Sequence, residues 1–98
     1  MARAGVTHDG HLMWHCPGCD STHEVPIKGD DAWEWNQSTY APTVDPSILI
    51  FDYDTGITQC HCRMKDGMIY FFGDSSHKLA ERTVDMDDDF VCVTKAVV

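Results

Sequence analysis

The sequence has few basic side chains and no long apolar run. Its 98 residues include seven lysines and arginines against 16 aspartates and glutamates, giving a formal net charge of −9. A surface that follows nucleic-acid phosphates needs a lysine or arginine for each contact, so this charge disfavours nucleic acid as a partner. The longest apolar segment, residues 48–51, has the length of a strand, and we expect no membrane partner.

The N-terminus carries no apolar signal region, and the chain contains no repeat or low-complexity tract. We therefore expect a cytoplasmic protein with one domain over residues 1–98 and a flexible segment at residues 1–10. A chain of this length buries only roughly 60–65% of its unfolded surface, so its core is marginal. A bound metal would supply the stability that such a core lacks.

Turn-forming residues divide the chain into segments of strand length. The pattern predicts strands at residues 11–15, 22–27, 32–36, 47–53, 57–64, 68–72 and 90–93. Asp66-Gly67 is a strong hairpin signal and predicts that the strands before and after it pair. A short helix is expected at residues 76–82, where Asp74 suits the N-terminal end. The expected fold class is a small β-rich α+β protein: an antiparallel sheet with a zinc knuckle and one short helix.

The five cysteines are clustered and favour a metal site. Thiols stay reduced in the cytoplasm, where grouped cysteines are more often metal ligands than disulfides. Cys16 and Cys19 form a C-x-x-C knuckle, and Gly18 permits the tight turn that brings two thiolates to one ion. A redox pair, which would require a βαβ setting, and a chance pairing are the less favoured alternatives.

Two further ligands follow from the register of the predicted hairpin. If Lys65 pairs with Met68, Cys60 falls opposite Gly73, where the chain continues toward His77. Alternation along the strand puts Cys60, Cys62 and Met64 on the expected core face and His61 on the other face. The predicted zinc ligands are Cys16, Cys19, Cys60 and His77, with His61 as an alternative to Cys60 and His23 as a third possibility.

An ordered set of motifs over about residues 12–86 resembles a known group of proteins. The motifs are Trp14-x-Cys16-Pro17-Gly18-Cys19, Trp33-x-Trp35-Asn36, Pro42-Thr43-x-x-Pro46-Ser47, Cys60-His61, Asp66-Gly67-x-Ile69 and Asp74-x-x-His77-x-Leu79-Ala80. They resemble an uncharacterised family of small phage and prophage proteins, often labelled ammonia monooxygenase-like. The resemblance implies a phage origin and a metal at the Cys and His positions, but no reaction. The chain departs from the family pattern at Ser75, where the family tends to have cysteine.

No catalytic residue is identified from the sequence. The zinc-deaminase signature H-x-E is absent, and no serine or cysteine has a recognisable base and orienting group. We therefore expect a phage accessory protein with structural zinc that binds a host or phage macromolecule, such as an inhibitor of a host system acting in the host cytoplasm. Its contact surface would be acidic and its partner a basic protein surface; the predicted contact residues are Asp85, Asp87, Asp88 and Asp89. The alternatives are a small zinc-dependent enzyme and a nucleic-acid-binding zinc module.

Overall fold

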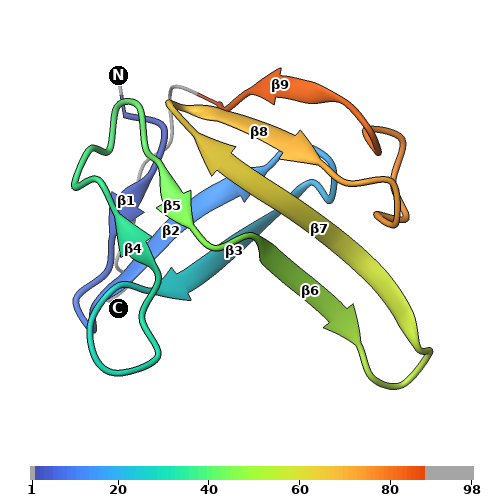
Figure 1. Cartoon of the computed structure of the whole chain (residues 1–98), viewed down its shortest axis with the longest axis horizontal. Coiled ribbons are helices and arrows are strands. Elements are labelled where there is room, and N and C mark those ends of the chain that lie inside the picture. The colour runs from blue at the N-terminus through green and yellow to red at the C-terminus, as the bar shows by residue number, and fades with distance from the viewer. Residues whose placement is uncertain (1, 88–98) are drawn as a thin grey trace, which may run out of the picture.

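The computed structural model describes residues 2–87, which fold into strands joined by turns (Figure 1). The strands make three antiparallel sheets in the orders β1-β2-β3, β4-β5 and β6-β7-β8-β9. Their bounds are β1 Gly5–Val6, β2 His11–Cys16, β3 Ser21–Pro26, β4 Glu34–Trp35, β5 Val44–Asp45, β6 Ile48–Asp52, β7 Ile57–Lys65, β8 Met68–Phe71 and β9 Thr83–Asp85.

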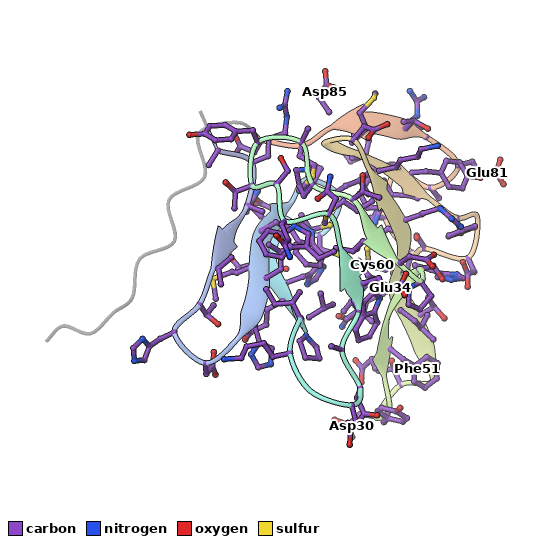
Figure 2. All side chains as sticks on the ribbon, turned by 60° about the vertical axis from the view of Figure 1, so that its left-hand side comes forward. Asp30, Glu34, Phe51, Cys60, Glu81 and Asp85 are labelled. Carbon is purple, nitrogen blue, oxygen red and sulfur yellow. The ribbon has the colours of Figure 1, made fainter. Side chains whose placement is uncertain are left out.

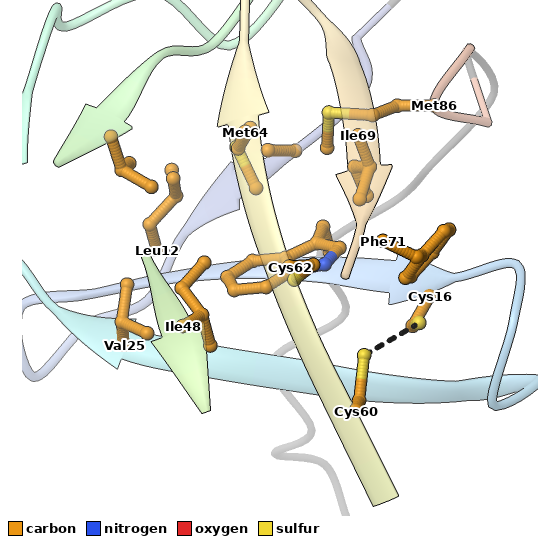
Figure 3. Close-up of a cluster of buried hydrophobic side chains, with 13 residues drawn as sticks. Leu12, Cys16, Val25, Ile48, Cys60, Cys62, Met64, Ile69, Phe71 and Met86 are labelled. Atoms are coloured by element: carbon orange, nitrogen blue, oxygen red, sulfur yellow. Dashed lines mark hydrogen bonds between the residues drawn. The ribbon is translucent and has the colours of Figure 1, made fainter. Parts of the chain in front are cut away.

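The core lies between the first and third sheets, and each sheet contributes one face of alternating apolar residues. Along β2 every second side chain is buried, beginning at Leu12, and along β8 the buried residues are Ile69 and Phe71. This is the period of two expected for strands with one face in the core. Figure 3 shows the cluster that results, with side chains from β2, β3, β6, β7 and β8. The prediction that Cys60, Cys62 and Met64 face the core is confirmed.

The turn at Asp66-Gly67 sets the register of β7 and β8. Both residues have a positive φ, 52° and 78°, as the favoured two-residue hairpin turn requires. Lys65 pairs with Met68, as the sequence predicted, and the ladder continues to Cys62 and Phe71. The inner face of β7 is therefore fixed by the turn beyond its end.

A bulge changes the register between β6 and β7. Phe51 pairs with Thr58, whereas Ile50 pairs with Cys60, so that Gln59 is the extra residue on β7. A bulge of this kind moves every following pair by one position. As a result Ile48 pairs with Cys62, and both side chains are buried.

The predicted helix at residues 76–82 is wrong. The segment forms turns closed by hydrogen bonds between residues three positions apart. The Ala80 amide donates to the His77 carbonyl, and the Arg82 amide donates to the Leu79 carbonyl. Seven residues are too few to repay helix nucleation, and Glu81 adopts a positive φ of 67° that ends any helical path. The observed fold over residues 2–87 is all-β. The strand expected at residues 90–93 lies outside the described part of the chain.

Within the described residues, no helix has the length and apolar composition needed to cross a membrane. The apolar segment at residues 48–51 lies in β6, as its length indicated.

The packing of the core predicts a clear contrast between two isoleucines. Ile69 on β8 is fully buried, whereas Ile57 at the start of β7 is 51% exposed. We expect Ile69→Ala to lower the free energy of unfolding by about 2–5 kcal/mol, because it removes buried methyl groups and leaves a cavity. Ile57→Ala is the matched control and should change it by less than about 0.5 kcal/mol. Urea denaturation of both variants measures the difference, and equal losses would contradict this description of the core.

Candidate active site and metal cluster

Ser47, His61 and Asp74 form a hydrogen-bonded chain on the outer face of the third sheet. Ser47 Oγ lies 3.4 Å from His61 Nε2, and His61 Nδ1 lies 3.0 Å and 3.1 Å from the two Asp74 carboxylate oxygens. With Nδ1–H donating to Asp74, Nε2 is left as the acceptor for the Ser47 hydroxyl. A serine, a base in contact with it and a carboxylate behind the base are the parts of a serine-hydrolase triad.

Hydrogen bonds from the loop after β8 hold the His61 backbone in place. The His61 amide donates to Ser75 Oγ at 3.0 Å, and the Ser75 hydroxyl donates to the His61 carbonyl at 3.1 Å. The same carbonyl accepts from the Phe72 amide at 2.8 Å. The Phe72 ring also stacks on the imidazole, with ring centroids 4.3 Å apart. The imidazole is thus fixed next to Asp74 by backbone, carboxylate and aromatic contacts.

Ser47 sits at the point where the chain enters β6. The Trp33 indole N–H donates to the Pro46 carbonyl at 2.9 Å and lies 3.4 Å from the Ser47 carbonyl. Ser47 directly precedes Ile48, the first residue paired with β7. The serine is therefore held from one side by Trp33 and from the other by the sheet that carries His61.

A second cluster lies on the opposite face of β7. The ligand atoms of its four residues all lie within 4.8 Å of one another; the residues are Cys16, Cys19, Cys60 and His77. The sulfurs of Cys16 and Cys60 are 3.9 Å apart at one end of the core, as Figure 3 shows. Tetrahedral zinc with Zn–S bonds of about 2.3 Å places two sulfurs about 3.8 Å apart. The Cys₃His cluster can therefore hold a metal ion such as zinc.

The surroundings of His77 fit a metal ligand. Its Nε2 atom is buried and has no hydrogen-bond partner among the described residues, while the Leu79 amide lies 3.2 Å from Nδ1. A buried polar atom without a partner is costly unless something binds there. A Cβ on Gly18 would lie 2.3–2.6 Å from three atoms of the His77 ring. The knuckle glycine is thus required for the imidazole to reach the thiols.

The electrostatics of the cluster also favour a cation. Contact with the Cys60 thiol, together with burial, raises the pKa of Cys16 to about 12. Burial, together with the nearby Cys16 thiol, raises the pKa of Cys19 to about 11. Burial lowers the pKa of His77, which favours the neutral imidazole that metals bind. Burial and thiol contacts thus favour the neutral forms of Cys16 and Cys19, and a cation among the thiols would favour the thiolates.

The remaining predicted residues lie elsewhere. His61, the alternative to Cys60, belongs to the serine chain, and His23 is buried edge-on to Trp14 outside the cluster. Asp85 is exposed on β9 at the periphery of the molecule, whereas Cys60 lies inside it (Figure 2). Asp87 is exposed in the segment after β9, and Asp88 and Asp89 lie outside the described residues. The expected basic partner of these aspartates stays a prediction.

The sequence analysis missed the Ser47–His61–Asp74 chain. The three residues are 14 and 13 positions apart, so only the pairing of β6 with β7 and the return of the chain after β8 bring them together. A signal was present, because each of them stands in one of the quoted motifs: Pro46-Ser47, Cys60-His61 and Asp74-x-x-His77. We had assigned Cys60-His61 and Asp74-x-x-His77 to the metal site and had given Pro46-Ser47 no chemical role.

The fold and the serine chain together define a small all-β protein with the side-chain arrangement of a serine hydrolase. A family model described as bacterial ubiquitination-like system serine protease (BubE) matches residues 2–72, and the chain belongs to this family. The matched range includes Ser47 and His61, and Asp74 follows two residues after its end. No curated protein and no solved structure is similar enough to the chain to count as a match.

The family match corrects two expectations from the sequence. The resemblance to a family of phage and prophage proteins is wrong, because residues 2–72 match the BubE model. The expected phage accessory protein that binds through an acidic surface is wrong for the same reason, and the alternative of an enzyme is better supported. Two motifs that we attributed to metal binding, Cys60-His61 and Asp74-x-x-His77, also carry the histidine and aspartate of the outer face.

Proposed function

We propose that this chain is a serine protease acting on proteins of a bacterial ubiquitination-like system, with Ser47 as nucleophile, His61 as general base and Asp74 as the group that orients His61. The observation that carries this proposal is the continuous contact from Ser47 Oγ through His61 to Asp74, at 3.4 Å and 3.0 Å. Membership of the BubE family supports the same reaction class independently of the distances.

The geometry suits hydrolysis through an acyl intermediate. Ser47 Oγ attacks the scissile carbonyl while its proton passes to His61 Nε2, and His61 then gives that proton to the leaving amine. In the second half of the reaction, water attacks the acyl group while its proton passes to His61 Nε2. His61 then returns that proton to Ser47 Oγ as the ester bond breaks, which restores Ser47. Asp74 accepts the Nδ1–H hydrogen bond throughout and stabilises the positive charge that forms on the ring. The Asp74 side chain is half exposed and that of His61 is 28% exposed, so a substrate can reach the base from solvent.

We further propose that the Cys₃His cluster binds one zinc ion with a structural role. Four ligands fill a tetrahedral site, which leaves no position for a catalytic water. The ion would join β7 at Cys60, the turn after β2 at Cys19 and the loop after β8 at His77. That loop also carries Asp74, so the metal would secure the loop on which the triad depends. The free thiols suit a cytoplasmic location, which we retain as part of the proposal.

The triad predicts which residue reacts with a serine-directed probe. We expect a fluorophosphonate to label Ser47 covalently and Ser47→Ala to abolish the labelling, because the attacking oxygen is lost. Asp74→Asn should slow peptide hydrolysis by about 10⁴-fold, because the amide favours the wrong histidine tautomer. Intact-mass spectrometry and hydrolysis assays measure these effects. Ser21→Ala, at an exposed serine of β3, is the control, and labelling that persists in Ser47→Ala would contradict the proposal.

The metal site predicts different outcomes for two buried cysteines. Cys16 and Cys62 are both fully buried, but only Cys16 belongs to the cluster. Protein purified without added metal should contain about one zinc per chain. Cys16→Ser should lose that zinc and lower the melting temperature by at least about 10 °C, because metal binding is coupled to folding. Cys62→Ser is the matched control and should keep the zinc. Elemental analysis and thermal unfolding decide, and full zinc content in Cys16→Ser would refute the assignment.

A further inference from the structure

A cavity of about 400 Å³ opens on the outer face of the third sheet, beyond the triad. Its walls come from β7, the hairpin turn, β8 and β9; the lining residues are Arg63, Lys65, Asp66, Met68, Tyr70 and Thr83. The lining residues of the strands alternate with the core residues Cys62, Met64 and Ile69, so they point away from the core. The cavity therefore lies on the same side of the sheet as His61.

The cavity lies next to His61 along β7, because its lining residue Arg63 stands two positions after His61 on the same face of that strand. Ser47 directly precedes Ile48, which pairs with Cys62, and Arg63 in the wall of the cavity directly follows Cys62. The Tyr70 ring meets the Phe72 ring edge-on at 5.0 Å, and Phe72 in turn stacks on His61. Along β7, Arg63 and Lys65 lie about 7 and about 13 Å from His61, at roughly 3.3 Å per residue.

The chemistry of the cavity favours an apolar occupant. Met68 and Tyr70 expose 39% and 37% of their surface, which is apolar area available for contact. The charged groups at its rim have both signs: Arg63 pairs with Asp45 at 3.6 Å, and Asp66 accepts from the Thr43 hydroxyl at 3.4 Å. Lys65 on β7 and Asp85, the β9 partner of Met68, also carry opposite charges. A rim of mixed sign gives neither an acidic nor a basic side chain a net advantage.

We propose that this cavity binds a large apolar side chain of the polypeptide substrate, two to four residues from the bond that Ser47 cleaves. An extended peptide rises by about 3.3 Å per residue, so a side chain two to four positions away reaches the distances of Arg63 and Lys65 from His61. Burying that side chain against Met68 and Tyr70 would select the substrate and align its backbone at Ser47. The inference rests on the proposed protease activity and adds to it a specificity site.

Two measurements on the wild-type chain separate the cavity from the triad. The rate of labelling by a small fluorophosphonate reports the triad, since this probe does not extend to the cavity. A library of decapeptides, each varied at one position and analysed by mass spectrometry, reports specificity. We expect leucine, methionine or phenylalanine to be preferred about tenfold or more over glycine and aspartate at one position two to four residues from the cleaved bond.

Variants of the cavity then test its role. Thr83→Trp fills the cavity from β9 and Met68→Glu places a charge on its apolar wall, so either should reduce the apolar preference about tenfold. Both should leave the labelling rate of Ser47 unchanged. Thr55→Trp, at the exposed turn before β7, is the matched control for added bulk. Melting temperatures establish that each variant is folded, and Met68→Glu replaces Thr83→Trp if the larger side chain prevents folding.

The outcomes distinguish the two proposals. A wild-type chain that is not labelled overturns the protease assignment, and the specificity site with it. A chain that is labelled but cleaves no peptide of the library, or cleaves without an apolar preference, overturns the specificity site alone. The same holds if the preference is unchanged in both folded cavity variants.

Discussion

Consecutive side chains of a strand point to opposite faces of its sheet, and at residues 60–61 of β7 this constraint places a thiol and an imidazole back to back. Cys60 faces the core beside Cys16, while His61 faces outward between Ser47 and Asp74. Neither residue can shift along the strand without exchanging faces with its neighbour. The Cys₃His cluster and the Ser47–His61–Asp74 chain therefore share one register, and a change that disturbs this part of β7 affects both.

The loop between β8 and β9 also supplies residues to both clusters, although it has no regular structure. Asp74 turns outward to His61 and His77 turns inward to the cysteines, and Ser75 between them bonds both backbone groups of His61. The Ser76 amide adds a bond to the Gln59 carbonyl at 3.4 Å. Such a loop would otherwise be a low-stability part of the protein. Its attachment to β7 at several points gives the carboxylate the fixed position that an orienting group needs.

The register of β7 with β8 and the inner face of β7 could be predicted from the sequence. The Asp66-Gly67 turn fixes the pairing of Lys65 with Met68, and alternation from there gives the inner face with Cys60. The serine site depends on the bulge at Gln59, which no local pattern indicates. An unbulged ladder from Phe51 and Thr58 would pair Ile48 with His61 and direct both to one face. The bulge resolves this conflict by keeping Ile48 and Cys62 in the core and His61 outside. The helix prediction failed because capping residues were weighed without the length needed for nucleation.

The location of the apolar side chains connects stability with function. Leu49 and Tyr53 are 55% and 88% exposed, and Tyr70 and Met68 line the outer cavity, so these residues add little to the core. A domain of this size has few apolar residues to spare, because its buried fraction is already low. The Cys₃His cluster lies where the core ends, and a metal there would replace apolar contacts with ligand bonds. A bound metal at this end would therefore compensate in part for the apolar side chains that lie on the outer face instead of in the core.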